Sequence, residues 1–269
     1  MNILEAIFLG FIQGATEFLP ISSSGHLLVI PTILGLNTPN SILIAITHQG
    51  TLLAVLLYFW RDLFDIAQAT LTALFQRQPF ATPSARLGWF IAVGSIPAAV
   101  AGLGFNDWFD AMFERPSAAA FFLLGTAALL VIGERLLNTT KTIDDMTWPD
   151  AIIIGLAQMM ALLPGISRSG STITAALGRG YDRATAARYS FLLGVPAILG
   201  AGLLALLDLA EAPNLSQQIP ALTASFITSA IVGYACIHWL LQWLRQHSLY
   251  PFAIYCTALS LFYWLTQLF

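Results

Sequence analysis

The chain alternates long apolar stretches with short polar ones, and six of the apolar stretches are long enough to cross a bilayer. A membrane-spanning helix needs about 20 predominantly apolar residues. Stretches near this length cover residues 41–60, 86–105, 117–135, 186–208, 219–242 and 250–269. The pattern therefore predicts an all-α polytopic membrane protein with six transmembrane helices.

Outside these six stretches, two polar segments each lie between two apolar arms that are too short to span a bilayer. The first lies between arms 3–13 and 27–36, and the second between arms 151–163 and 171–178. Short arms that meet at Pro, Gly and Ser predict two re-entrant helical hairpins. Irregular backbone at membrane depth is tolerated only where protein buries it or where it lines a water-filled cavity. Each hairpin tip is therefore expected inside the protein.

The two polar segments also resemble each other. When they are aligned, the identical pairs include Gly10 with Gly155, Gln13 with Gln158, Ile21 with Ile166, Ser22 with Ser167, Ser24 with Ser169 and Gly25 with Gly170. Residues 1–138 then hold one hairpin and three spans, and residues 148–269 hold the same set. Because three is odd, the second half is inserted upside down, which predicts an inverted-topology repeat. Broken hydrophobic segments at matching places in two halves indicate a site at their interface.

The distribution of positive charge predicts the orientation, because cytoplasmic loops are enriched in Lys and Arg. Four loops carry most of the basic residues: Arg61, Arg77 and Arg86; Arg135 and Lys141; Arg179, Arg183 and Arg188; and Arg245. The opposite loops carry acidic residues, namely Asp107, Asp110, Glu114, Asp208 and Glu211. With the basic loops in the cytoplasm, both termini and the entrance of the first hairpin face outward. Arg115 is the exception to the trend.

Composition supports a membrane protein and excludes other classes. The chain is 57% hydrophobic and 9% charged, whereas soluble domains carry about 25% charged residues. A net charge of −3 without a Lys/Arg cluster gives no indication of a nucleic-acid partner. Small residues along several spans would permit a homodimer.

The first polar segment carries groups that could activate a nucleophile. Gln13 and Glu17 are four residues apart, so they share a face of a helical arm. Pro20 stops that arm, residues 22–24 supply three hydroxyls, and His26 follows Ser22 by one turn. Glu17 could equally bind a divalent cation. The serines could also serve only as helix-packing hydrogen bonders, but ionisable groups at membrane depth are functional by default.

The second polar segment has the features of an anion site. It opens a short helix, whose first backbone N–H groups are unpaired and partly positive. Arg168 adds a planar guanidinium that matches phosphate oxygens. The other candidate phosphate-binding residues are Gly165, Ser167, Ser169, Gly170 and Thr172, together with Ser22 and Ser24 of the first segment. The alternative is a structural ion pair between Arg168 and Glu17.

Other residues give weaker signals. His48 lies near the outer start of the first span and could line the cavity, although a structural role is favoured. The segments 94–97 and 194–196 combine Gly and Pro and are interpreted as kinks that let helices pack closely.

The two segments resemble the signature motifs of bacterial undecaprenyl-diphosphate phosphatases of the bacitracin-resistance type. The motifs are Glu17-Phe18-Leu19-Pro20-Ile21-Ser22-Ser23-Ser24-Gly25-His26 and Pro164-Gly165-Ile166-Ser167-Arg168-Ser169-Gly170. Phe59-Trp60-Arg61 and Ser190-Phe191-Leu192-Leu193-Gly194-Val195-Pro196 are also similar to that family. The resemblance therefore covers most of the chain.

This resemblance implies a fold, an activity and a location. The fold is an interlocked inverted repeat, and the reaction hydrolyses undecaprenyl diphosphate to undecaprenyl phosphate and inorganic phosphate. That reaction recycles the lipid carrier of cell-wall synthesis and confers bacitracin resistance. The resemblance also implies a divalent cation, Mg²⁺ or Ca²⁺, and a site open to the outer, periplasmic face of the cytoplasmic (inner) membrane.

The resemblance also implies roles for individual residues. The family's first motif has an acid or an amide, followed four residues later by an acid. These two positions correspond to Gln13 and Glu17, which would hold the cation. Its essential serine corresponds to Ser23, its histidine to His26 and its arginine to Arg168. Gln at position 13 removes one carboxylate and leaves the cation to Glu17, diphosphate oxygens and water.

The resulting mechanism leaves alternatives open. Arg168 and the helix N-terminus would hold the terminal phosphate. Ser23 or His26 would attack phosphorus, or His26 would activate Ser23 or water; Ser23 as nucleophile with His26 as base is the preferred reading. A transporter remains the competing class, because inverted repeats with broken helices are typical of transporters. A purely structural membrane subunit would leave both polar segments unexplained.

Overall fold

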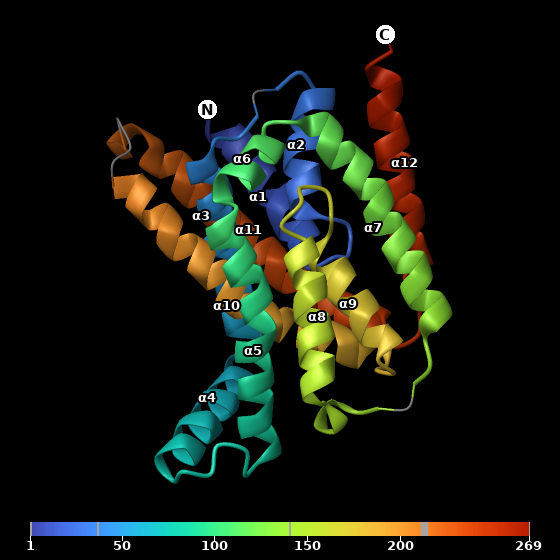
Figure 1. Ribbon diagram of the computed structural model, residues 1–269. Coiled ribbons are helices and arrows are strands. Elements are labelled where there is room, and N and C mark those ends of the chain that lie inside the picture. Colours follow the sequence, from blue (N-terminus) through green and yellow to red (C-terminus); the bar gives the residue numbers. More distant parts are fainter. Residues whose placement is uncertain (1, 37, 140, 211–214, 269) are drawn as a thin grey trace.

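The computed structural model describes residues 2–36, 38–139, 141–210 and 215–268. Within these ranges the protein is built of helices (Figure 1). They are α1 (Ile3–Glu17), α2 (Ser23–Ile33), α3 (Ser41–Tyr58), α4 (Trp60–Phe75), α5 (Pro83–Gly104), α6 (Asn106–Phe113), α7 (Pro116–Leu136), η1 (Ile143–Asp145), α8 (Trp148–Met160), α9 (Arg168–Gly178), α10 (Arg183–Ala210), α11 (Leu215–Trp243) and α12 (Tyr250–Thr266).

Five helices of the described ranges are long and apolar enough to cross a membrane, so the chain is a multi-pass membrane protein. They are α3, α5, α7, the Arg183–Leu203 part of α10 and the Gln217–Trp243 part of α11. These five agree with five of the six spans expected from hydropathy. The sixth expected span, 250–269, corresponds to α12, which is 17 residues long.

Two helices were not expected from the sequence. Residues 61–86 were interpreted as a loop, but α4 occupies most of this segment and packs on α5. Its only buried residue in the described set is Ala73, so one side of α4 is polar or exposed. The short helix α6 lies in the segment between α5 and α7.

Two helical hairpins carry the polar segments; that they are re-entrant stays a prediction. The α1–α2 hairpin turns over residues 18–22, and the α8–α9 hairpin turns over residues 161–167. The first arm of each hairpin packs mainly on a long helix from the other half of the chain: α1 on α11, and α8 on α5. In Figure 1 the α1–α2 turn and the α8–α9 turn both lie in the interior of the bundle.

Small residues permit these close helix contacts. A Cβ added at Gly10 would meet the backbone of Ser225 on α11, and one added at Gly155 would meet the backbone of Gly94 on α5. Backbones that approach this closely are typical of helix association in membranes. Gly94, interpreted from the sequence as a packing residue, has that role here.

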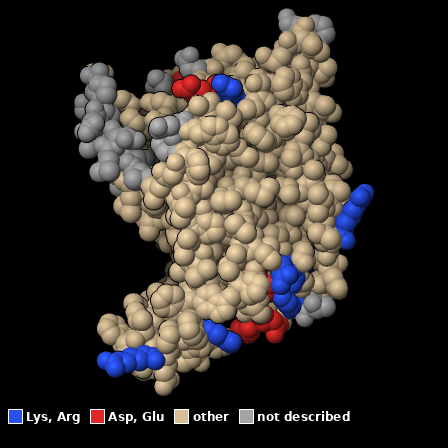
Figure 2. Space-filling model, viewed as in Figure 1, with Lys and Arg blue, Asp and Glu red and all other residues tan. Residues whose placement is uncertain are grey.

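The two ends of the molecule differ in charge. Both termini lie at one end of the bundle (Figure 1). In Figure 2 most visible Lys and Arg side chains lie toward the opposite end, and one basic group lies near the termini beside acidic side chains. Of the acidic residues expected in the outer loops, Glu211 and the side chains of Asp107, Asp110 and Asp208 lie outside the described part of the protein.

Candidate active site

The two hairpin tips are held by the same hydrogen bonds. Ser22 caps α2, where its Oγ accepts from the Gly25 N–H at 3.2 Å and lies 3.2 Å from Ser24 Oγ. Ser167 caps α9 in the same way, accepting from the Gly170 N–H at 3.0 Å with Ser169 Oγ at 3.1 Å. A side-chain oxygen that accepts from the third residue of a helix is the usual N-cap. The sequence similarity of the two segments is therefore also a similarity of local structure.

The two tips are in direct contact. Ser24 Oγ accepts from the Gly165 N–H at 3.3 Å, and Ser169 Oγ donates to the Leu19 carbonyl at 3.0 Å. A Cβ added at Gly25 would lie 3.2 Å from the Gly165 Cα. The prediction that the two polar segments meet is thus confirmed by these contacts.

Gly165 shapes the second tip. Its φ is +97°, a conformation that glycine adopts far more readily than other residues, and an added Cβ would overlap the Ala119 carbonyl oxygen. Thr126 on α7 then fixes the turn: its hydroxyl donates to the Gly165 carbonyl and accepts from the Ser167 N–H, both at 2.8 Å. The first tip has its own unusual residue, because Ser22 has a φ of +71°.

Glu17 is the centre of the polar cluster. Its Oε1 accepts from Arg168 Nη2 at 2.8 Å, and its Oε2 accepts from Ser23 Oγ at 2.6 Å and from Gln13 Nε2 at 2.9 Å. His48 Nε2 on α3 lies 3.5 Å from Oε2. The Glu17 side chain is only 6% exposed, whereas Arg168 is 14% and His48 26% exposed. The cluster is therefore reached from the side of Arg168 and His48.

Arg168 is placed by α10 as well as by Glu17. Its Nη1 donates to the Ser190 carbonyl at 3.2 Å. A Cβ added at Gly194, one turn further along α10, would overlap the guanidinium. Gly194 was interpreted from the sequence as part of a kink; the structure adds that the missing side chain makes room for Arg168.

His26 is buried and contacts partners at both ring nitrogens. Its Nδ1 lies 2.7 Å from the Ser22 carbonyl oxygen and its Nε2 lies 2.8 Å from the Tyr255 hydroxyl on α12. Ser23 therefore donates to Glu17 in this arrangement, while His26 faces Tyr255. Whether His26 acts as the base for Ser23 stays a prediction.

The other predicted phosphate-binding hydroxyls already have partners within the protein. Ser22 and Ser167 act as caps, and Ser169 bonds Leu19. Thr172 Oγ1 donates to the Arg168 carbonyl and lies 2.6 Å from Ser190 Oγ. Most of these residues are buried, as is Gly170, whereas Ser23 and Ser24 are half-buried.

The oxygen atoms around Glu17 could supply some, but not all, of the ligands of a hard cation. Gln13 is fully buried and its Oε1 has no hydrogen-bond partner, which leaves an amide oxygen beside the Glu17 carboxylate. Oxygen ligands of this kind suit Mg²⁺ and Ca²⁺. The described residues contain no group of three or more His, Cys, Asp or Glu that could hold a metal by themselves. Any cation here would therefore need ligands from substrate or water.

A second buried carboxylate lies at the base of the α8–α9 hairpin. Asp150 accepts from Arg179 Nε at 2.5 Å, Lys141 Nζ at 3.0 Å and the Tyr181 hydroxyl at 2.9 Å. Burial alone would raise the pKa of Asp150, but these hydrogen bonds and one from Thr147 outweigh it and hold the pKa well below its usual value. Lys141 and Thr147 come shortly before Asp150 in the sequence, whereas Arg179 and Tyr181 follow α9. The cluster therefore joins the start of α8 to the segment after α9.

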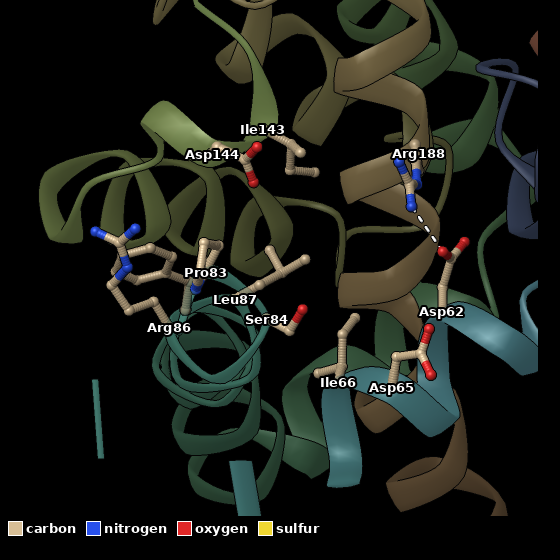
Figure 3. A pocket seen from close by; sticks show the side chains of 11 residues that line it. Asp62, Asp65, Ile66, Pro83, Ser84, Arg86, Leu87, Ile143, Asp144 and Arg188 are labelled. Atoms are coloured by element: carbon tan, nitrogen blue, oxygen red, sulfur yellow. Dashed lines mark hydrogen bonds and ion pairs between the residues drawn. The ribbon is translucent and has the colours of Figure 1, made fainter. Parts of the chain in front are cut away.

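The cavity shown in Figure 3 is a separate feature. It has a volume of about 260 Å³ and lies among α4, α5, η1 and α10. Arg188 pairs with Asp62 across one side of it at 2.7 Å. None of the predicted site residues lines this cavity.

Several residues that position the cluster lie outside the two polar segments and were not predicted as site residues. They are His48, Ser190, Gly194, Thr126 and Tyr255, contributed by α3, α10, α7 and α12. His48 was noted as a residue that could line the cavity, and it does contact Glu17. Tyr255 and Thr126 lie within apolar helices, where nothing nearby in the sequence distinguishes them.

These features define a multi-pass helical membrane protein with a buried carboxylate that binds a guanidinium and a serine hydroxyl. Comparison with known families agrees with this class. The family described as bacitracin resistance protein BacA matches residues 6–262, so the chain belongs to that family.

Curated relatives match over nearly the full chain. The chain is 43% identical over 270 residues to the undecaprenyl-diphosphatase of Chloroherpeton thalassium, covering 97% of this chain and 95% of the relative. It is 41% identical over 268 residues to the undecaprenyl-diphosphatase of Thermomicrobium roseum, covering 97% and 96%. It is 43% identical over 262 residues to that of Micrococcus luteus, covering 95% and 93%.

Proposed function

We propose that this protein hydrolyses undecaprenyl diphosphate to undecaprenyl phosphate and inorganic phosphate, and thereby recycles a lipid carrier and confers bacitracin resistance. The family and the names of the full-length relatives support this activity. The observation that carries it within the structure is the pair of contacts at Glu17, which places a serine hydroxyl and a guanidinium on the two oxygens of one buried carboxylate.

Arg168 would bind the terminal phosphate. A guanidinium forms two parallel hydrogen bonds to phosphate oxygens, so those oxygens can replace Glu17 as its partner. The same group would stabilise the charge on the equatorial oxygens during transfer, which is usually the largest catalytic contribution in phosphoryl transfer. The exposed part of Arg168 and the half-buried Ser23 and Ser24 are accessible to such a headgroup.

Ser23 would be the nucleophile. Its Oγ attacks the terminal phosphorus while its proton passes to Glu17 Oε2, the base 2.6 Å away. Undecaprenyl phosphate leaves and a phosphoserine remains. Water then attacks the phosphoserine with His26 as base, and protonated Glu17 returns its proton to Ser23 Oγ as the bond to phosphorus breaks. Inorganic phosphate is released, the serine is restored, and His26 gives up its proton to solvent.

A divalent cation fits this site as an addition to the protein groups. Gln13 Oε1 and Glu17 would hold it, together with oxygens of the diphosphate. Bound there, Mg²⁺ or Ca²⁺ would neutralise charge on the two phosphates.

The membrane arrangement is part of the proposal. α12 would be the sixth span, the α1–α2 and α8–α9 hairpins would be re-entrant, and residues 1–138 and 148–269 would form two inverted repeats. The packing of α1 on α11 and of α8 on α5 supports this arrangement, as do the matching hydrogen bonds of the two tips. With the basic end in the cytoplasm, the site would open to the periplasmic face of the inner membrane; a homodimer remains a further expectation.

The experiment is phosphate release from undecaprenyl diphosphate by purified protein in detergent micelles. We expect release by the wild type, its loss with a chelator, and a fall of at least about 10²-fold for Ser23→Ala. Serine 84, on α5 and outside the cluster, provides a matched control as Ser84→Ala. A transporter would release no phosphate, because micelles have no two compartments, and that outcome would exclude the proposed reaction.

A further inference from the structure

The protonation of the His26 ring follows from its neighbours. The Ser22 carbonyl oxygen, 2.7 Å from Nδ1, can only accept a hydrogen bond. Nδ1 therefore carries the proton, and in the neutral ring Nε2 carries the lone pair. The Nε2 atom, through which a neutral His26 can accept a proton, lies 2.8 Å from the Tyr255 hydroxyl.

Tyr255 is placed to act on that nitrogen. The phenol ring is almost parallel to the imidazole, with an angle of 10° and ring centroids 5.5 Å apart. Its hydroxyl group is both donor and acceptor. It can donate to Nε2 of neutral His26, and it can accept from Nε2–H when the ring is protonated.

We propose that Tyr255 is a positioning residue for His26, keeping the imidazole in one orientation and one tautomer while it gains and loses a proton. The inference rests on the proposed phosphatase function, in which His26 activates water. Two contacts at opposite nitrogens hold the ring. When water gives its proton to Nε2, the phenol O–H turns away from the Nε2 lone pair, and the phenol oxygen then accepts from the new Nε2–H. A phenylalanine would keep the ring stacking and remove only this contact.

The charged and titratable groups near His26 are few. The helices that pack on α2 are α1, α7 and α12. In their described parts these helices carry Glu5 and Glu17 on α1, Glu134 and Arg135 on α7, and Tyr250, Tyr255, Cys256 and Tyr263 on α12, while Arg168 begins α9 beside the first tip. Glu134 and Arg135 lie about three turns from Leu123, where α7 meets Gly25. Tyr255 alone among these groups has a hydrogen bond to His26 in the described structure.

The test compares Tyr255→Phe with Tyr250→Phe. Both tyrosines lie on α12 and both are 42% exposed, so the pair is matched for helix and for exposed fraction. For Tyr255→Phe we expect kcat for phosphate release to fall about tenfold with KM within about twofold of wild type. We also expect the acidic limb of the kcat profile to move about one pH unit lower, because an imidazolium loses more than a neutral ring when its partner is removed. Tyr250→Phe should match wild type in kcat, in KM and in the position of the acidic limb.

Nitrogen NMR of ¹⁵N-histidine-labelled protein gives a readout that does not depend on activity. Wild type should show His26 with a protonated Nδ1 and an unprotonated Nε2, assigned with His26→Gln, and Tyr255→Phe should shift the Nε2 resonance. A wild-type His26 that carries its proton on Nε2, or a Tyr255→Phe variant with unchanged kcat, pH profile and Nε2 shift, overturns the proposal. Wild type that releases no phosphate refutes the proposed function instead, while the NMR result still decides the Tyr255 contact.

Discussion

The tip of the α1–α2 hairpin and the tip of the α8–α9 hairpin use one hydrogen-bonding frame to present different side chains. In each tip a capping serine binds the N–H three residues later and the hydroxyl two residues later. Positions 23 and 168 correspond, and both side chains reach Glu17. Positions 26 and 171 correspond, and both side chains bond the carbonyl of their capping serine.

The two tips differ in the side chains that these shared hydrogen bonds position. The first tip presents a hydroxyl and an imidazole, which can be a nucleophile and a base. The second presents a guanidinium and a small hydroxyl, which can bind and stabilise an anion. A repeated hydrogen-bonding pattern has thus been given two complementary kinds of chemistry, and the proposed reaction needs both tips.

The bases of the two hairpins differ as well. The second is closed by the buried Asp150 cluster, which joins α8 to the segment after α9. The first begins at a solvent-exposed capping box formed by Asn2 and Glu5. We therefore expect the Asp150 cluster to contribute to stability and the Glu17 cluster to contribute to turnover.

Removal of Arg168 should have the largest effect on turnover. Arg168→Ala takes away the group that we propose binds the terminal phosphate, so phosphate release should fall on the order of 10³-fold. Arg168→Lys keeps a charge beside Glu17 but loses the planar fork, and should retain more activity than the alanine variant. Both are measured in detergent alongside the melting temperature; a folded Arg168→Ala protein with near-normal turnover would place Arg168 outside the site.

The corresponding positions 26 and 171 provide a direct test of the comparison. His26→Ala should lower turnover about 10²-fold or more, because it removes the proposed general base. Ser171→Ala should stay within about threefold of wild type, since the Ser171 hydroxyl only donates to the Ser167 carbonyl at 2.8 Å. If both variants lost turnover equally, both side chains would serve only to hold the structure of their hairpin tips.

Gly194→Ala should have an intermediate effect. The added methyl group occupies the space of the Arg168 guanidinium and displaces it from Glu17, so turnover should fall about 10-fold to 100-fold. Gly200→Ala on the same helix is the matched control, because nothing lies within 4 Å of its added Cβ. If the two variants have the same turnover, α10 does not position Arg168.

Asp150→Asn should have the smallest effect on turnover and a large one on stability. It leaves Arg179 and Lys141 without their buried partner, which costs about 3 kcal/mol of unfolding free energy. The melting temperature in detergent should fall while kcat at low temperature stays within about threefold of wild type. A large loss of kcat without a loss of stability would assign Asp150 to the reaction.

The comparison of wild type with Asp150→Asn also predicts how stability depends on pH. Because the pKa of Asp150 is lowered by folding, its contribution to stability is complete at neutral pH and is lost as the pH falls below about 4, the value for an unfolded Asp. The difference in melting temperature between wild type and Asp150→Asn should therefore be largest near pH 7 and narrow on acidification. A difference that stays constant as the pH falls from about 4 to about 2 would contradict this account.

Much of the architecture could be predicted from the sequence, because membrane spans and broken arms depend on local composition. Five expected spans, both hairpins and the contact between their tips follow from hydropathy and from the similarity of two short segments. The helix α4 could not be predicted in this way. Its 16 residues are too few to span, and the segment was interpreted as a loop because Arg61, Arg77 and Arg86 lie along it.

The site could be predicted only as far as its residues lie in the two polar segments. Glu17, Ser23 and Arg168 were expected together, and they are in contact. Tyr255 is 229 residues from His26 and comes from a helix with no polar motif. Its role depends on which face of α12 packs on α2, and that is decided by tertiary packing rather than by any local pattern.

The packing of α1 on α11 has a consequence for how the protein is made. A ribosome synthesises α1 first and α11 near the end, so the earliest helix enters the bilayer long before its main neighbour exists. During that interval Glu17 has neither the arginine that neutralises it nor the helix that covers its arm. The Glu17 cluster therefore forms only late in biogenesis. Prematurely terminated chains should be substrates for membrane proteases.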